Sequence, residues 1–142
     1  MGHMQFSILV AEDDTGLRRL LLKLLHECGY TAVGAADGSE AMRLLSNCYY
    51  DLIVSDIVMA PMDGLALTLR AKASAPGTKV LLMTAYGEKH TAGRARASGA
   101  DGYISKPFAM RHLLATVQTL LGERAGGKVS KQSSTPSERS QP

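Results

Sequence analysis

Polar side chains with reactive groups follow four of the five apolar runs in this sequence, at the point where each run ends. They are Glu12, Asp13 and Asp14 after the first run, Asp56 after the third, Thr84 after the fourth and Lys106 after the fifth. Carboxylates that share one crevice repel one another unless a cation lies between them. A cation site that keeps open positions for water and phosphate suits Mg²⁺. With the hydroxyl and the lysine, this set predicts phosphoryl transfer to a carboxylate.

Each of these residues also has an ordinary structural interpretation. Residues 12–14 could form a solvated turn that caps the following helix, and Asp56 could open a turn. Thr84 could be a β-former at a strand end, and Lys106 could lie in a loop before a proline. These separate explanations do not predict polar groups at four strand ends of one chain, so we favour a shared site.

The apolar runs have the length of strands and alternate with segments of helical periodicity. The expected strands are residues 6–11, 31–36, 52–55, 79–83 and 102–105, and the expected helices are residues 15–28, 39–47, 65–75, 88–98 and 109–121. Several strands are apolar at consecutive positions, which is typical of parallel strands covered on both faces. Five βα units in about 120 residues predict a five-stranded parallel sheet, doubly wound as (βα)5 and flavodoxin-like.

The strand order 2-1-3-4-5 explains which strand ends bear reactive residues. Sites in open α/β sheets form outside the carboxyl ends of the strands, where the strand order reverses. In this order the first and third strands, which end at residues 12–14 and Asp56, flank that point. The second strand ends in Ala35 and Ala36 without a reactive group and becomes an edge.

The helical segments differ in how strongly they are specified. In the first, Arg18 is expected on the solvated face and Gly29 just after the end. The second is expected to begin with Ser39 as its cap. The fourth has only alanines as apolar residues and Gly93 in its middle, so we expect weak packing and a mobile helix.

The chain of 142 residues, 45% of them hydrophobic, predicts one domain over residues 4–121. Residues 1–3 resemble a vector remnant, and residues 122–142 are expected to form a disordered tail or linker stub. Residues 1–121 carry 12 Lys or Arg and 11 Asp or Glu, too small an excess to predict nucleic-acid binding by this domain. Without a membrane-spanning run or a signal pattern, we expect a cytoplasmic protein with no membrane partner.

The two cysteines, Cys28 and Cys48, fit no metal-binding spacing. A domain with an adequate core does not need a disulfide, so we expect both thiols to be free. Free cysteine behaves as a small apolar residue, and we expect both to be buried.

The motifs at the strand ends resemble those of the receiver domain of two-component response regulators, over about residues 5–121. The motifs are ILVAEDD at the first strand end, DLIVSDIVMAPMDG around the third, VLLMTA at the fourth and GYISKPF at the fifth. This order and spacing are highly specific as a set. The resemblance implies a phosphoacceptor in a phosphorelay, whose phosphoryl group comes from a histidine kinase, a phosphotransfer protein or a small phosphodonor.

The resemblance also implies a role for each residue of the site. Asp56 is the position that becomes phosphorylated. Mg²⁺, for which Mn²⁺ can substitute, is held by Asp13, by Glu12 mainly through water, by Asp56 and by the backbone carbonyl of Val58. Thr84 and Lys106 contact the phosphoryl oxygens, and the Lys106–Pro107 bond is cis. Asp14 matches a variable position and has no assigned role.

The resemblance also implies a switch role for one pair of residues and a role in tuning hydrolysis for another. Tyr103 lies at the position of an aromatic switch that turns inward together with Thr84, which changes the surface of the fourth helix, fifth strand and fifth helix. Val58 and Tyr86 lie at positions that tune hydrolysis. Because one is apolar and the other bulky, we expect them to hinder an attacking water and to lengthen the life of the phosphoryl group.

One stretch departs from the family pattern. After Asp56 the family has Met-Pro-x-Met-Asp-Gly, whereas this chain has Ala60 in the place of the proline and Pro61 one position later, with the distance to Asp63 and Gly64 unchanged. Because Pro61 lacks an N–H and restricts Ala60, we expect an altered loop and an intact metal site.

The leading hypothesis is therefore a signalling receiver that acts through a phosphorylation-dependent protein target. It is not an enzyme beyond its self-catalysed phosphotransfer and slow autodephosphorylation. A first alternative is the truncated N-terminal receiver of a longer DNA-binding regulator. A second is an aspartyl-phosphate phosphohydrolase, which would need a general acid two residues after Asp56, where this chain has Val58.

Overall fold

The computed structural model describes residues 5–84 and 89–122, with the side chains of residues 89–92 excepted. Its strands are β1 (Ser7–Ala11), β2 (Thr31–Ala35), β3 (Leu52–Asp56), β4 (Lys79–Thr84) and β5 (Gly102–Ser105). Its helices are α1 (Thr15–Glu27), α2 (Gly38–Asn47), α3 (Gly64–Ser74), α4 (Lys89–Ala97) and α5 (Met110–Leu121). In these ranges no helix is both long and apolar enough to cross a membrane. The predicted vector remnant and, apart from Gly122, the predicted tail lie outside the described residues.

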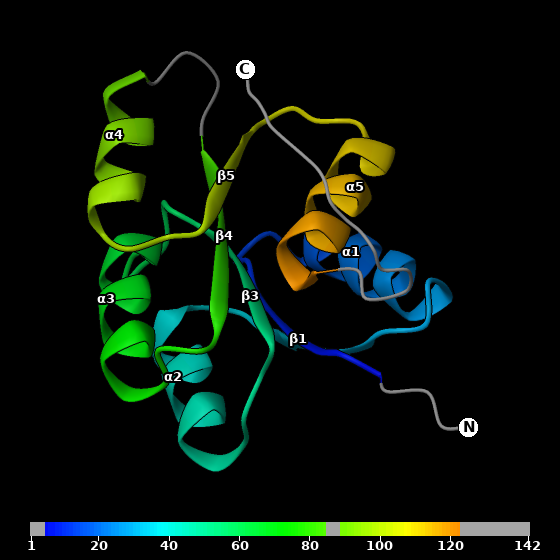
Figure 1. The fold of residues 1–142 in the computed structure, drawn as a ribbon, viewed down its shortest axis with the longest axis horizontal. Coiled ribbons are helices and arrows are strands. Elements are labelled where there is room, and N and C mark those ends of the chain that lie inside the picture. The colour runs from blue at the N-terminus through cyan, green and yellow to red at the C-terminus, as the bar shows by residue number, and fades with distance from the viewer. Residues whose placement is uncertain (1–4, 85–88, 123–142) are drawn as a thin grey trace.

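The five strands form one parallel sheet in the order β2-β1-β3-β4-β5. Helices α1 and α5 cover one face of this sheet, and α2, α3 and α4 cover the other (Figure 1). The predicted doubly wound, flavodoxin-like fold is therefore confirmed. Its strand order reverses between β1 and β3, which places the crevice beside the ends of these two strands.

The core lies in two layers, one on each face of the sheet. Strand β3 contributes to both, because Leu52 and Val54 pack with α1 and α5 while Ile53 packs with α2 and α3. All five residues of β3 are buried. This explains why the strand is apolar at consecutive positions, and it leaves Asp56 at the end of a fully covered strand.

The predicted element boundaries are correct to within one or two residues, and the corrections concern the ends. Strands β3 and β4 continue to Asp56 and Thr84, so both polar residues are the last of their strands. Ser39 does not cap α2. Asp37 does, by accepting a hydrogen bond from the Glu40 N–H at 2.8 Å, while the Glu40 carboxylate accepts one from the Ala36 N–H at 2.7 Å. These two bonds satisfy two free backbone donors, whereas a cap at Ser39 would satisfy one, because Met42 three residues later has no carboxylate.

The cysteines are free as expected, but the prediction that they are buried is wrong. Cys28 and Cys48 are the C-terminal caps of α1 and α2. Both therefore lie where the chain leaves a helix at the protein surface, and cysteine's apolar character did not decide their place.

Helix α4 has one fully buried residue in its described part, Ala95, while Arg94 and Arg96 are exposed. An alanine buries much less apolar surface than a leucine. The sparse packing agrees with the composition of the helix, and its mobility stays a prediction.

Candidate functional site

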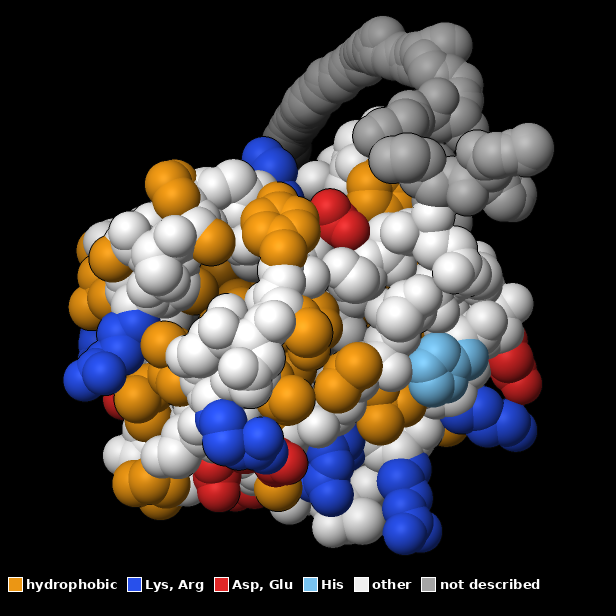
Figure 2. All heavy atoms as spheres, turned by 90° about the horizontal axis from the view of Figure 1, so that it is seen from below, with side chains coloured by type: hydrophobic (Ala, Val, Ile, Leu, Met, Phe, Trp, Pro, Cys, Tyr) orange, Lys and Arg blue, Asp and Glu red, His pale blue; other side chains and the backbone are white. Residues whose placement is uncertain are grey.

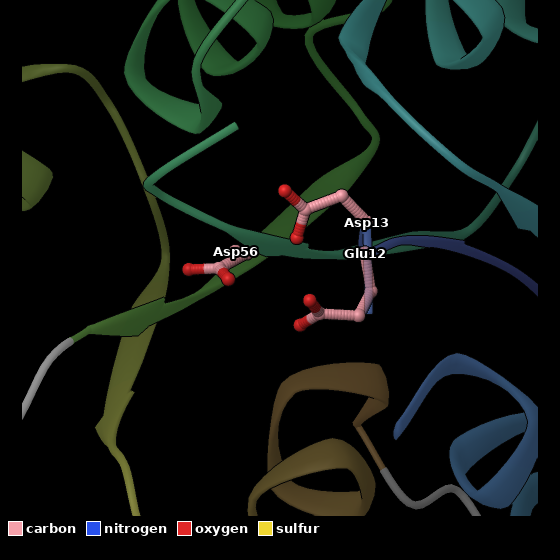
Figure 3. A group of neighbouring side chains, drawn as sticks. All are labelled: Glu12, Asp13 and Asp56. Atoms are coloured by element: carbon pink, nitrogen blue, oxygen red, sulfur yellow. The ribbon is translucent and has the colours of Figure 1, made fainter. Parts of the chain in front are cut away.

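Three carboxylates meet at the carboxyl ends of β1 and β3. Glu12, Asp13 and Asp56 each have a carboxylate oxygen within 4.8 Å of those of the other two, and the side chains of Glu12 and Asp13 extend toward the side on which Asp56 lies (Figure 3). The parallel register pairs Ala11 with Ser55, which brings the residues that follow them side by side. The burial of the three differs, since Glu12 is 1% exposed while Asp13 is open to solvent.

Lys106, which follows β5, supplies the cation of this cluster. Its Nζ lies 2.8 Å from Asp56 Oδ2 and 3.1 Å from Glu12 Oε1. Its backbone N–H donates to the Thr84 carbonyl at 2.7 Å, and the peptide bond between it and Pro107 is cis, as predicted. The loop after β5 therefore fixes the lysine at the sheet edge, where one ammonium serves two carboxylates.

Burial and charge change the protonation of this cluster. The pKa of the Glu12 carboxyl is raised above its usual range, mainly because the group is buried. The Asp56 carboxylate raises this pKa further, whereas the hydrogen bond from the Asp14 N–H and the charge of Lys106 lower it. Burial by itself lowers the pKa of Lys106, but the carboxylates of Asp56 and Glu12 outweigh that effect, and the net pKa is raised. The lysine therefore stays charged, and an additional cation would favour the ionised form of Glu12.

The segment after β3 is anchored at both ends. The Val58 N–H donates to Asp56 Oδ1 at 3.2 Å, which orients the carboxylate, and the Gly64 N–H donates to the Ile57 carbonyl at 2.8 Å. A Cβ on Gly64 would lie 2.3 Å from the Asp56 carbonyl oxygen, so only glycine fits here. Asp63 then caps α3 through the Ala66 N–H.

Between these anchors, the displaced proline forms a cis peptide bond with Ala60. The side chain of Val58 is 71% exposed beside the carboxylates. The anchors fit the expected intact site, while the expected difference from the family loop stays a prediction.

The side chains of Thr84 and Tyr103, the predicted switch pair, bond to residues outside the acidic cluster. The Thr84 hydroxyl is buried, and its bonds go to the Ile104 carbonyl and Ser105 Oγ, each at 3.4 Å. Tyr103 is 38% exposed and contacts Arg96 of α4. Tyr86 lies outside the described residues. In this structure only Lys106 among the predicted phosphoryl contacts reaches Asp56.

Two arginines with specific contacts were not predicted to take part. Arg18 was expected on the solvated face of α1, but it is half-buried and donates to the Glu12 carbonyl at 2.7 Å. Arg96 donates to the Tyr103 hydroxyl. The first could have been found because Arg18 lies one turn into the helix that follows Glu12. The second could not, since it depends on how α4 lies against β5.

A separate hollow of about 280 Å³ lies at the other end of the sheet. It is lined by residues of the C-terminal ends of α2 and α3 and the segments after them, among them Cys48, Tyr49 and Thr78. Figure 2 shows this end of the molecule, where hydrophobic side chains lie in several groups among charged ones. The reactive residues at the strand ends do not line it.

Comparison with known proteins yields one family model that matches most of the chain. The model is described as "Response regulator receiver domain" and matches residues 8–118. Protein PetR of Rhodobacter capsulatus is 39% identical over 116 residues, which are 80% of this chain and 48% of PetR. Transcriptional regulatory protein ZraR of Escherichia coli is 37% identical over 121 residues, 85% of this chain and 27% of ZraR. The chain thus spans about half or less of these relatives.

Solved structures of similar length match nearly from end to end. The receiver domain protein of Methanospirillum hungatei is 30% identical with a TM-score of 0.80, and the match covers 84% of this chain and 96% of that one. The chemotaxis response regulator CheY4 of Vibrio cholerae is 28% identical with a TM-score of 0.78, covering 82% and 99%.

Proposed function

Because this chain belongs to the response regulator receiver domain family, we propose that it accepts a phosphoryl group on Asp56 and signals through a protein target. The observation that carries the proposal is the contact between Lys106 Nζ and Asp56 Oδ2 at 2.8 Å, beside two further carboxylates. This arrangement supports an aspartate whose charge is held in place by a cation that can also stabilise a phosphoryl group.

The proposed reaction moves a phosphoryl group from a phosphohistidine of a histidine kinase, or from a small phosphodonor, to Asp56. An Asp56 oxygen forms the bond to phosphorus while the bond to the donor breaks. Lys106 lies where it can offset the charge of the phosphoryl oxygens, and Thr84 could donate to another oxygen once its hydroxyl leaves β5. The chain thus acts as a phosphoacceptor rather than as an enzyme that turns over a separate substrate.

Mg²⁺ fits the donor set of this site, since hard carboxylate oxygens are the ligands it takes in proteins. Asp13, Asp56 and, through water, Glu12 would hold it together with the Val58 carbonyl, and Mn²⁺ could replace it. When bound, the ion offsets negative charge on the transferring group. The raised pKa of Glu12 supports a site that favours an added cation.

Replacing Asp13 by Asn is expected to weaken Mg²⁺ binding by roughly tenfold or more, because affinity depends on ligand charge. Without metal the variant should be slightly more stable than wild type, because one of three repelling carboxylates is gone. Thermal unfolding across a Mg²⁺ series, with and without chelator, measures both effects. The matched control is Asp14→Asn, since Asp14 is exposed and caps α1 through the Leu17 N–H. Equal Mg²⁺ responses in the two variants would rule out Asp13 as a ligand.

The phosphoryl group on wild-type protein is expected to persist for minutes or longer, because apolar Val58 cannot position a water. The resemblance gives Tyr86 the same tuning role. Val58→Asn should shorten the lifetime about tenfold or more, whereas Val58→Leu should leave it unchanged. Loss of label is followed after the donor is removed, and decay of the wild type within seconds would contradict this expectation.

A second candidate is the receiver part of a longer DNA-binding regulator. The observation that favours it is coverage, since the chain spans 27% of ZraR, which is named as a transcriptional regulatory protein. The length of the intact gene separates this candidate from a receiver without an output domain. A phosphohydrolase function is disfavoured by Val58 at the position of the general acid.

The proposed function is tested by incubating the chain with Mg²⁺ and acetyl phosphate, and then with a panel of histidine kinases. The expected product is one alkali-labile phosphoryl group per chain, which mass spectrometry of peptides assigns to Asp56. Pull-down with the phosphorylated and unphosphorylated forms then identifies the target. A stable phosphoester on a hydroxyl side chain, with no modification of Asp56, would refute the proposal.

A further inference from the structure

One arginine of α4 holds the aromatic ring at the centre of the α4–β5 surface. Arg96 Nη1 donates to the Tyr103 hydroxyl at 2.5 Å, and its guanidinium carbon lies 5.1 Å from the centre of the ring. Both side chains are exposed. A guanidinium over an aromatic ring is attracted to the face of that ring. The contact therefore favours the outward position of Tyr103.

This surface carries positive charge with little negative charge to balance it. In the described side chains from Gly93 to Leu121 the only carboxylate is Asp101. Asp101 is already held by Lys72 Nζ at 2.7 Å and by the Val80 N–H at 2.8 Å. Over the described side chains Arg96 has no ion-pair partner, and Tyr103 holds its guanidinium.

We propose that Arg96 keeps Tyr103 outward before phosphorylation and binds a carboxylate of an acidic protein segment once the ring has turned inward. The inference rests on the proposed function for its trigger. The two contacts of Arg96 compete, because the Nη1 that donates to the phenol cannot at the same time join Nη2 in a bidentate pair with a carboxylate. When the ring turns inward, the Tyr103 hydroxyl leaves Arg96, and the N–H groups of the guanidinium become free to bind a carboxylate.

The charge pattern favours an acidic peptide over a nucleic acid as the occupant. The described part of α4 offers two arginines, Arg94 and Arg96, whereas salt-sensitive nucleic-acid binding typically neutralises about six to ten phosphates. A single carboxylate on a peptide is enough to pair with the guanidinium of Arg96. Arg96 would anchor that peptide, while Arg94, two residues earlier in α4, points to another side of the helix.

The first test follows Tyr103 directly, with 3-fluorotyrosine placed at this position and read by fluorine NMR. In unphosphorylated protein, Arg96→Gln should raise the inward fraction about threefold, the loss expected from an exposed cation–π contact. Arg94→Gln removes the same charge from the same helix without touching Tyr103, and it should leave the signal unchanged. Wild type treated with beryllofluoride, a phosphoryl mimic, provides the reference signal for the inward position of the Tyr103 ring. Identical signals from the two variants would overturn the proposal.

The second test measures binding of a fluorescent hexaglutamate peptide, with hexalysine and a short single-stranded DNA as comparison probes. Wild type treated with beryllofluoride should bind hexaglutamate about threefold tighter than untreated protein, and Arg96→Gln should lose this gain while Arg94→Gln keeps most of it. A gain that survives in Arg96→Gln, or a larger gain for DNA, would overturn the proposal. If the wild type takes up neither the phosphoryl group nor its mimic, the proposed function is refuted. If the wild type takes up either one but the two variants behave alike, only the inference about Arg96 is refuted.

Discussion

Asp56→Asn is expected to reduce phosphoryl transfer to this chain by roughly 10³-fold or more, because an amide is a poor nucleophile and no other group can replace the carboxylate at that position. The change keeps the shape of the side chain and its contact with the Val58 N–H. Asp56 is 13% exposed and shares Lys106 with Glu12, which keeps that ammonium paired. The free energy of unfolding should therefore change by less than about 1 kcal/mol.

Label transferred from acetyl phosphate and from the kinase panel measures this loss, with circular dichroism to show that the variant is folded. The matched control is Asp63→Asn in the same stretch, because Asp63 caps α3 and asparagine caps a helix equally well. The control should accept phosphoryl groups at close to the wild-type rate. If Asp56→Asn were labelled as strongly as Asp63→Asn, the acceptor would have to be another residue.

Lys106→Met is expected to lower both phosphotransfer and stability. Lys106 is 29% exposed and pairs with Glu12, which is almost fully buried. Loss of one partner from a fully buried pair costs about 3–5 kcal/mol. Partial exposure screens the pair, so we expect a loss of about 2 kcal/mol at neutral pH. Transfer should fall as well, because the cation beside Asp56 is gone.

The stability loss in Lys106→Met should depend on pH in a definite direction. Burial raises the pKa of Glu12, so the folded state favours its protonated form, and the cost of ionising it grows as pH rises above the usual glutamate range. Removal of the lysine charge raises that pKa further. The difference between variant and wild type should thus be small at pH values below the usual glutamate range and larger at neutral pH.

The stabilisation by Lys106 itself also depends on pH, but it is lost at alkaline pH. Its pKa is raised in the folded state by Asp56 and Glu12, which outweigh burial. It therefore stabilises wild type below the usual lysine range, and that contribution disappears as pH rises through the raised value. The difference between the two proteins should shrink again in strong alkali.

Denaturant unfolding in chelator across this pH range measures these differences. Lys72→Met is the matched control, since Lys72 also pairs with a carboxylate, Asp101, but at the opposite end of the strands, before β4 and β5 begin. The stability loss in Lys72→Met should not increase between acid and neutral pH, because Lys72 does not pair with Glu12. A loss in Lys106→Met that is the same at every pH would contradict the assigned pairing with Glu12.

The reactive residues and their strands could be predicted because both rest on local patterns. Consecutive apolar residues 52–54 are typical of a strand covered on two faces, and the structure buries them in both core layers. Asp56 after such a strand needs a partner, since a carboxylate at a buried strand end is costly. That requirement predicts a cation site before any coordinates are known.

Contacts between side chains from distant elements could not be predicted in the same way. The sequence does not show that Thr84 bonds to β5, that Arg96 reaches the Tyr103 hydroxyl or that Cys48 lies at the surface. Each depends on how two strands, or a helix and the sheet, lie against each other in the folded chain. The local pattern specifies only which side of an element is apolar.

The sequence alone predicted the fold, the strand order and the carboxylates that meet at the strand ends, because strand and helix periods and the polar strand ends are encoded in consecutive residues. Only the tertiary structure decided that one ammonium serves both Asp56 and Glu12, and that Arg96 holds Tyr103. Lys106 and Glu12 are 94 residues apart, and their contact exists only because five parallel strands bring their carboxyl ends to one edge of the sheet.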